Sequence, residues 1–423
     1  MLTSRDPRLA GRVAFTYPNF VSYTIARFFI VVALEMQSVA VGWQVYEITK
    51  RPIDLGYVGL AQFLPGIVLF LFAGHAADIF DRRKLLMWCY AGFGLCSALL
   101  LAISWRTPHS VHWIYVVLVL LGIFRSFNFP VSRAILPHLV PEEHFPNAVA
   151  WNASTFQMAT IAGPALGGIA YALFHGPEAV YALAVAVSII STILTLRIHP
   201  LPTSPGKEPA EREPTSLRTV LAGFGFIWEK KLILGSISLD MFAVLLGGAV
   251  ALLPIYAREI LHTGPWGLGL LRSAPGVGAA LMAIVVAHRP IRRRAGLTML
   301  FTVAAFGLLT IIFGLSRSLV LSLAALFLLG ASDMVSVIIR ATLIQVATPD
   351  EMRGRVNAID FLFIGVSNEL GEFESGLTAQ WFGTVPAVVL GGVGTLLVIA
   401  TWAWLFPELR KADQLTVAEL MPK

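Results

Sequence analysis

The sequence predicts an all-α membrane protein whose twelve transmembrane helices form two six-helix bundles. Three observations predict this class: an apolar composition, twelve long apolar segments and an internal repeat. Of the 423 residues, 57% are hydrophobic and 13% are charged, whereas about a quarter of the residues in soluble domains are charged. A water-soluble fold could not bury this much apolar surface, so we expect the chain to lie in a lipid bilayer.

Each of the twelve apolar segments is long enough to cross a membrane as a helix. The hydrocarbon core of a bilayer, about 30 Å thick, is crossed by roughly 20 helical residues. Pro65, Pro164 and Pro275 fall inside such segments, where membrane helices tolerate proline. The predicted spans cover residues 20–43, 56–77, 85–104, 112–130, 148–174, 179–196, 232–257, 266–287, 297–315, 319–339, 356–382 and 385–406.

The two halves of the chain repeat one another. A shift of 210 residues aligns Tyr46 with Tyr256, and a shift of 208 residues aligns Gly163 with Gly371. Because an even number of predicted helices separates the copies, the repeat is parallel, with its axis along the membrane normal. We therefore expect an N-terminal six-helix half at 1–196, a cytoplasmic linker at 197–231, and a C-terminal half with a short cytoplasmic tail at 232–423.

The distribution of Lys and Arg predicts the orientation in the membrane. We place 23 of the 31 basic residues, Arg340 among them, on the side of the N-terminus and 5 on the other side. Arg27, Arg125 and Arg272 stay inside predicted helices. The positive-inside rule then places both termini in the cytoplasm. Since the basic residues form short clusters between apolar segments, we expect the lipid bilayer and no nucleic acid as the partner of this charge.

The sequence lacks the motifs of a membrane enzyme and of a cofactor site. It contains no Gly-x-Ser-x-Gly elbow, no His-Glu-x-x-His and no phosphate-binding loop with lysine. Cys89 and Cys96 lie in one apolar segment and give neither a disulfide framework nor a set of metal ligands. The N-terminal 18 residues are polar and basic, which is not typical of a cleavable signal peptide. We expect no enzymatic activity, no cofactor and no metal.

The loop after the second predicted span, Gly74 to Lys84, carries a spacing of glycine, acid and basic cluster. It resembles the cytoplasmic signature between helices two and three of the major facilitator superfamily, with Ile79 and Asp81 departing from the usual pattern. The resemblance implies a major facilitator fold. Gly74 would let two helices approach closely, and Asp78 would face the N-terminal end of a neighbouring helix. The cytoplasmic gate predicted here comprises Gly74, Asp78, Asp81, Arg82 and Arg83; the alternative is that the basic cluster only sets topology.

The fifth predicted span contains Gly163, Pro164, Gly167 and Gly168, preceded at four-residue steps by small residues. This segment resembles the antiporter signature of exporters in the same superfamily, which implies proton-coupled export. Small residues on one face also allow tight helix packing with no role in transport. Three further stretches, 271–278, 353–356 and 368–376, resemble the bacterial subgroup that contains the enterobactin exporter and drug efflux proteins.

Ionisable residues inside the predicted spans are functional candidates, because a charge in hydrocarbon costs several kcal/mol unless it is paired or hydrated. We single out nine such residues: Arg27, Glu35, Arg125, Asp240, Arg272, Asp333, Glu369, Glu372 and Glu374. We expect a conformational or proton-linked role for Glu35, Arg125, Asp240 and Asp333. Arg272 is either a member of this set or an arginine at the membrane interface.

The spacing of these residues predicts which of them act together. Glu369 and Glu372 are three residues apart and lie on nearly one helical face, so they can share a polar site that takes up and releases a proton near neutral pH. Glu374 points away from that pair. The alternative for all three is hydrogen bonding to backbone or serine at a helix crossing.

Two further pairs of embedded charges are predicted from spacing and from the repeat. Arg27 and Glu35 lie about two turns apart on roughly one face and can pair with each other or with residues across the cavity. Arg125 and Asp333 are equivalent under the repeat and carry opposite charges, so they can attract in one conformation and separate in another.

These features together predict a secondary transporter that exports a siderophore or an amphipathic drug-like molecule by proton-coupled alternating access. The resemblance implies a central cavity formed by helices one, four, seven and ten. A facilitator or an importer of the same fold is the alternative. We expect a monomer in the bacterial inner membrane, with a small-molecule substrate and protons as partners.

Overall fold

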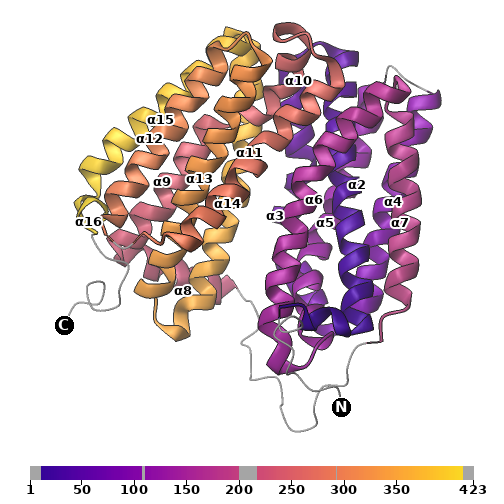
Figure 1. Ribbon diagram of the computed structural model, residues 1–423, viewed down its shortest axis with the longest axis horizontal. Helices are drawn as coiled ribbons and strands as arrows, with labels where there is room; N and C mark the ends of the chain where they lie inside the picture. Colours follow the sequence, from indigo (N-terminus) through magenta and orange to yellow (C-terminus); the bar gives the residue numbers. More distant parts are fainter. Residues whose placement is uncertain (1–10, 107–109, 200–216, 292, 413–423) are drawn as a thin grey trace. The chain divides into compact units, whose positions relative to one another are not determined.

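The computed structural model describes residues 11–106, 110–199, 217–291 and 293–412, and every regular element in these ranges is a helix. The first six long helices are α2 (Pro18–Thr49), α3 (Pro52–Ile79), α4 (Arg82–Arg106), α5 (Val111–Ile135), α6 (Phe145–Phe174) and α7 (Glu178–Leu196). The later long helices are α9 (Lys231–Gly247), α11 (Gly264–His288), α12 (Ala295–Leu315), α13 (Leu319–Ala347), α14 (Asp350–Phe382) and α15 (Thr384–Leu405). Figure 1 shows the first six of these helices in one group and the later six in another.

Eleven helices in the described ranges are long and apolar enough to cross a membrane. The remaining long helix, α14, has 33 residues and ample length, but it is more polar because it carries acidic and basic side chains along its whole course. The predicted all-α membrane fold is confirmed. The protein is a multi-pass membrane protein.

The seventh predicted span, 232–257, is not one continuous helix. After α9 the chain forms a 3₁₀ turn, η4 (Ala249–Leu252), then α10 (Leu253–Ile255) and a π-helix, η5 (Tyr256–Ile260). Gly248 leaves the helical region of backbone angles, at φ −69° and ψ 59°, and Pro254 lacks the amide that a helix interior requires. Glycine and proline are the ordinary causes of such breaks.

The range predicted as a linker, 197–231, contains a helix, α8 (Leu217–Glu229). This helix packs against α14, where a Cβ built on Gly223 would lie 3.3 Å from Cβ of Arg355. Residues 200–216 lie outside the described ranges.

The chain divides into two compact units. Unit 1 contains residues 1–44 and 61–215, and unit 2 contains residues 45–60 and 216–423. The end of α2 and the start of α3 therefore belong to unit 2, while the rest of both helices belongs to unit 1. The predicted boundaries at 196 and 232 stay a prediction.

Buried hydrogen bonds hold α2 against α4 and α7 in unit 1. Gln44 Nε2 donates to Ser104 Oγ at 2.9 Å, and the Tyr181 hydroxyl donates to Gln44 Oε1 at 2.7 Å. Two helical turns before Gln44, Gln37 Oε1 accepts a hydrogen bond from Ser97 Oγ at 2.6 Å. Since packing between helices gains little from the hydrophobic effect inside a membrane, such bonds help to select which helix faces meet.

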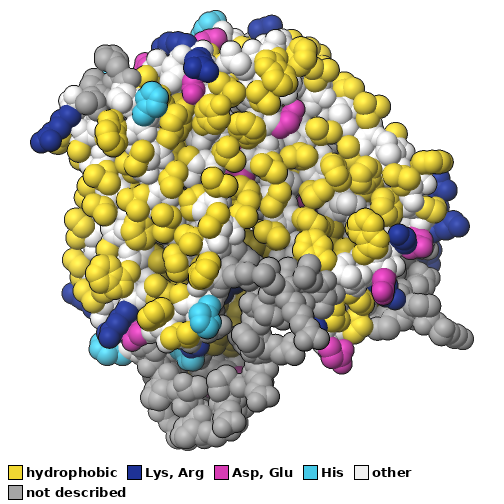
Figure 2. All heavy atoms as spheres, turned by 180° about the vertical axis from the view of Figure 1, so that it is seen from behind, with side chains coloured by type: hydrophobic (Ala, Val, Ile, Leu, Met, Phe, Trp, Pro, Cys, Tyr) yellow, Lys and Arg dark blue, Asp and Glu magenta, His cyan; other side chains and the backbone are white. Residues whose placement is uncertain are grey.

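The core of unit 2 is aliphatic and lies where α9, α12, α13 and α15 pack together; these four helices are labelled in Figure 1. It includes Leu239, Met299, Ile339 and Leu343. Large apolar side chains also cover the outside of the helices: Phe301, Val320 and Trp404 are 72%, 76% and 78% exposed. On the face drawn in Figure 2, hydrophobic side chains dominate and most Lys and Arg lie toward the margins. This surface suits lipid rather than water.

Candidate functional site

The predicted cytoplasmic gate is built into the start of α4. Asp81 Oδ1 accepts a hydrogen bond from the backbone amide of Lys84 at 3.1 Å, so Asp81 caps the helix N-terminus. Arg82 contacts the His138 ring after α5, and Arg83 donates to the carbonyl of Ile198 at 2.8 Å. These contacts tie the start of α4 to the ends of α5 and α7 within unit 1.

Two of the predicted gate residues, Gly74 and Asp78, lie near the end of α3. The side chain of Asp78 lies outside the described part of the structure, so its predicted position against a helix N-terminus stays a prediction. A Cβ built on Gly74 would meet no described heavy atom within 4 Å. Among the described residues no neighbour lies against this face of α3, and the close helix approach expected at Gly74 stays a prediction.

The small-residue face of α6 packs tightly on α2. A Cβ built on Gly163 would overlap Cβ of Glu35 and lie 3.0 Å from the carbonyl oxygen of Val32. One turn later, a Cβ on Gly167 would lie 2.6 Å from Cα of Met36. Pro164 and Gly168 beside them are buried. The tight packing expected from this face is present, and it holds the stem of Glu35 against α6.

Arg27, about two helical turns before Glu35 on α2, binds α6. Its guanidinium donates to Oδ1 of Asn152 and to the carbonyl of the same residue at 3.3 Å. It also lies over the Phe156 ring, 5.0 Å from the ring centroid. Arg27 therefore contacts the neighbouring helix α6, and its pairing across a cavity stays a prediction.

Arg125 lies on α5 opposite α3. Its Nη1 donates to Gln62 Oε1 at 2.9 Å, and the side chain is exposed. One turn earlier, Gly122 meets the backbone carbonyl of Gln62 directly, which brings the two helices together at this level. The predicted attraction between Arg125 and Asp333 stays a prediction.

The structure brings Glu369 and Glu372 of α14 together. A Cβ built on Gly59 would lie 2.9 Å from Oε2 of Glu372 and 3.3 Å from Oε2 of Glu369, so both carboxylates border the same point within unit 2. Both side chains are half-buried. Glu374 instead accepts a hydrogen bond from Thr378 Oγ1 at 2.6 Å along the same helix. The structure therefore groups Glu369 with Glu372 and gives Glu374 a different partner, in line with their spacing.

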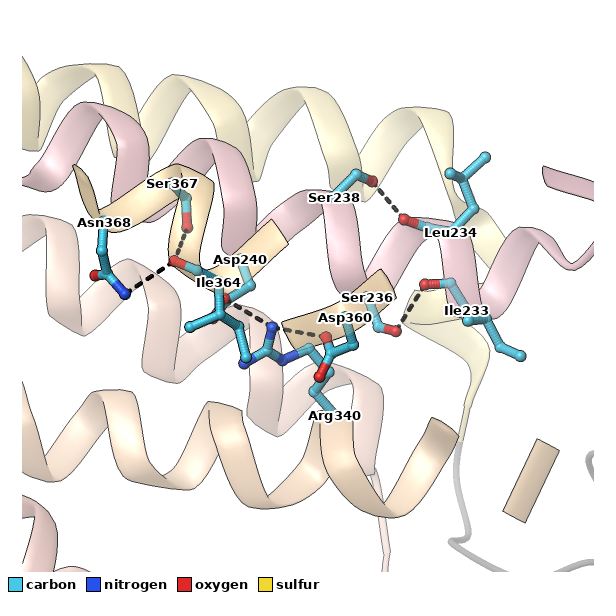
Figure 3. Close-up of polar contacts among 10 residues, drawn as sticks. All are labelled: Ile233, Leu234, Ser236, Ser238, Asp240, Arg340, Asp360, Ile364, Ser367 and Asn368. Carbon is cyan, nitrogen blue, oxygen red and sulfur yellow. Dashed lines mark hydrogen bonds and ion pairs between the residues drawn. The ribbon is translucent and has the colours of Figure 1, made fainter. Parts of the chain in front are cut away.

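A buried ionic network in unit 2 is centred on Arg340 of α13 (Figure 3). Nη1 of Arg340 lies 2.8 Å from Oδ2 of Asp240 on α9 and 3.1 Å from Oδ1 of Asp360 on α14. The side chains of Arg340 and Asp240 are 3% and 7% exposed. One guanidinium thus joins three helices in the interior of the unit.

Sequence reasoning missed Arg340 and Asp360. The count of basic residues places Arg340 in a cytoplasmic loop, because the predicted tenth span ends at residue 339. In the structure α13 continues to Ala347 and buries the arginine. The positive-inside asymmetry stays large without it. A signal was present: Arg340 follows Asp333 by seven residues, two helical turns, and therefore shares its face.

A second ionic group in unit 2 joins the end of α2 to the π-helix η5. The Tyr46 hydroxyl donates to Glu259 Oε1 at 2.5 Å, and Arg258 Nη1 lies 3.5 Å from Glu47 Oε1. Lys50 sits over the Tyr46 ring, 5.8 Å from its centroid. Partial burial, followed by repulsion from Arg258, lowers the pKa of Lys50. This cluster lies at the end of α2 that the positive-inside rule places on the periplasmic side of the membrane.

The chemistry available at these positions is ionic and acid–base. Glu369 with Glu372, and Asp240 with Asp360, each place two carboxylates within one buried or half-buried site. Paired carboxylates in an apolar setting can take up and release protons and can bind counter-ions.

The sequence model of the Major Facilitator Superfamily matches residues 23–372. The enterobactin exporter EntS of Citrobacter koseri is 29% identical over 407 residues, which cover 94% of each chain. The enterobactin exporter EntS of Shigella boydii is 28% identical over the same length and coverage.

Solved transporter structures share the fold. A bacterial homologue of the human lysosomal transporter Spinster, inward-facing and unoccupied, has a TM-score of 0.73 at 13% identity and covers 94% of this chain and 99% of its own. The D-xylose-proton symporter has a TM-score of 0.69 at 13% identity, with 93% and 99% coverage. At such identities the likeness concerns the fold alone. The chain is a transporter rather than an enzyme, and it belongs to the Major Facilitator Superfamily.

Proposed function

We propose that the protein exports a small molecule by proton-coupled alternating access. The main support is similarity to enterobactin exporters along 94% of both chains. The packed glycine face of α6 against α2, at the position of the antiporter-like segment, agrees with an exporter. The proposed substrates are siderophores of the enterobactin type or amphipathic drug-like compounds.

Coupling to protons is proposed to use the embedded carboxylates, with Glu369 and Glu372 as the first candidates. Two carboxylates that border one point repel each other when both are ionised, so protonation of one of them lowers the free energy of that arrangement. A bound substrate or cation that replaces the proton would favour a different conformation. Glu35, held against Gly163, is the corresponding candidate in unit 1.

The proposed location is the bacterial inner membrane, with the protein as a monomer and both termini in the cytoplasm. The excess of Lys and Arg in the loops on the side of the N-terminus supports this orientation. The two repeated halves, 1–196 and 232–423, are proposed to rock around a site between them.

Transport by everted membrane vesicles tests the proposal. Vesicles containing the protein should accumulate enterobactin when an acid-inside pH gradient is imposed, and a protonophore should abolish the accumulation. Vesicles without the protein are the control. Accumulation that ignores the gradient would remove proton coupling, and movement only in the opposite direction would make the protein an importer. If enterobactin fails, the same vesicles can be screened with fluorescent amphipathic dyes.

A further inference from the structure

The short helix α16 (Pro407–Lys411) follows α15 and packs against α9 and α12 (Figure 1). Its Leu409 is fully buried and belongs to the aliphatic core of unit 2. Just after the helix, the carbonyl oxygen of Ala412 accepts a hydrogen bond from the amide of Gly296 at 3.0 Å. A helix of five residues is not stable alone, so these contacts hold α16 at the end of the unit where α9 and α12 begin.

Exposed basic side chains surround the place where these three helices meet. Phe406, just before α16, packs on Gly235 of α9, and Lys231 lies one turn earlier on the same face of α9. Two arginines directly precede Ala295, and two basic residues directly follow Leu409. Because Ala295 and Leu409 belong to one core cluster, their basic neighbours lie at the same end of the unit. We call these exposed residues the basic patch: Lys231, Arg293, Arg294, Arg410 and Lys411.

The acidic residues of unit 2 do not balance the basic patch. Two exposed acids stand beside it in the sequence, Glu229 and Glu408. The patch therefore keeps a net positive charge. Four of its members form no ion pair within the described residues: Lys231, Arg293, Arg410 and Lys411.

The equivalent loop of unit 1 uses its arginines inside the protein. A shift of 210 residues aligns Arg83 with Arg293. Arg83 donates to the carbonyl of Ile198 at 2.8 Å, and Arg82 beside it contacts the ring of His138. The same loop position thus holds a structural contact in unit 1 and an exposed charge in unit 2. Packing of the helices does not account for the charge at Arg293.

Large aromatic side chains lie on the outer surface next to the basic patch. Trp404, three residues before α16, is exposed, and so is Phe301, six residues after the start of α12. Tryptophan is enriched at the level of lipid headgroups, and Lys and Arg follow it on the cytoplasmic side. This sequence of apolar, aromatic and basic side chains places the patch at the level of phospholipid phosphates.

We propose that the basic patch binds the phosphate group of an anionic phospholipid in the cytoplasmic leaflet. Its Arg and Lys side chains donate charge-assisted hydrogen bonds to the phosphate oxygens, and the acyl chains lie along the exposed surfaces of α12 and α15. A zwitterionic lipid binds less well, because its own cation is repelled by the patch. The bound lipid connects α16 to the starts of α9 and α12. Binding requires neither a substrate nor a pH gradient, so the site is independent of the proposed export.

Native mass spectrometry of the full-length protein in detergent, titrated with phosphatidylglycerol or phosphatidylcholine, tests the proposal. The unmodified protein should retain phosphatidylglycerol in preference. Each basic residue near an anionic membrane surface accounts for about a fivefold gain in binding, so Arg410→Gln/Lys411→Gln should weaken retention by at least about tenfold. Arg410→Lys keeps the charge and should bind as the unmodified protein does. The matched control, Arg12→Gln/Arg197→Gln, removes two exposed charges from unit 1 and should not change retention.

Three outcomes would overturn the proposal: equal affinity for the two lipids, equal losses in the patch variant and the control, or displacement of the lipid by millimolar inorganic phosphate. The last result would show an anion site that needs no acyl chains. Thermal unfolding without added lipid checks that both double variants fold. If Arg410→Gln/Lys411→Gln unfolds early, Arg293→Gln, a change in the loop before α12, should still lower retention about fivefold. Unchanged retention in a folded Arg293→Gln would also refute the site.

Discussion

Arg340 is the residue on which the interior of unit 2 depends most. Its guanidinium compensates two carboxylates from different helices, Asp240 with 7% and Asp360 with 16% of the side chain exposed. A buried network of this kind contributes little compared with an apolar core of the same shape, but removing one partner is costly.

We expect Arg340→Gln to lower the free energy of unfolding by about 3–5 kcal/mol, because it leaves Asp240 and Asp360 buried and uncompensated. Thermal unfolding in detergent measures this. The triple variant Arg340→Gln/Asp240→Asn/Asp360→Asn should recover most of the loss. Equal stability of the unmodified protein and Arg340→Gln would show that the network is hydrated and not buried.

Neutralising either carboxylate beside Gly59 should uncouple export. We expect Glu369→Gln and Glu372→Gln each to reduce gradient-driven export on the order of tenfold, within the usual coupling free energy of about 1–3 kcal/mol. Initial rates in everted vesicles measure the effect. Glu374→Gln is the matched control on the same helix, since Glu374 bonds to Thr378 and faces away from the pair. Equal losses in all three variants would argue for a structural role instead.

At the scale of the elements, the helices of this protein meet where side chains are small. The α2–α6 contact depends on Gly163 and Gly167, and the α3–α5 contact depends on Gly122. Close approach of backbones gains van der Waals contact that larger residues would prevent. The one helix that carries many charges, α14, is also the helix that supplies Asp360, Glu369 and Glu372.

Gly167→Ala and Gly74→Ala should differ although both glycines lie inside long helices. At Gly167 the added methyl would lie 2.6 Å from Cα of Met36, so we expect a loss of about 1–3 kcal/mol from overpacking. At Gly74 the methyl meets nothing described within 4 Å, so we expect a gain of up to about 1 kcal/mol from helix propensity. Thermal unfolding of the two variants side by side measures the difference. Destabilisation by Gly74→Ala would support the predicted close helix approach at Gly74.

At the scale of the whole molecule, orientation in the membrane follows from loop charges and not from packing. The positive-inside rule acts during insertion on Lys and Arg near the ends of the spans. It places Lys50, between α2 and α3, on the periplasmic side, and it places the loop containing Glu143 in the cytoplasm.

Labelling of single cysteines tests this orientation. In intact cells a membrane-impermeant maleimide should react with Lys50→Cys and should react with Glu143→Cys only after permeabilisation; both positions are exposed. The native Cys89 and Cys96 are buried and should stay unlabelled, so the unmodified protein is the control. The opposite pattern would reverse the predicted topology and the direction assigned to transport.

The sequence by itself determined the membrane class, most of the long helices and the grouping of Glu369 with Glu372 on α14, because composition and helical periodicity are local properties of a chain. Only the tertiary structure decided which of these groups meet. Arg340 is 100 residues from Asp240 in the sequence, and its pairing depends on where α13 ends and how three helices are rotated about their axes. Likewise Asp81, predicted as part of a gate, proved to cap α4, since the partner of a short acidic side chain depends on geometry at a single helix turn.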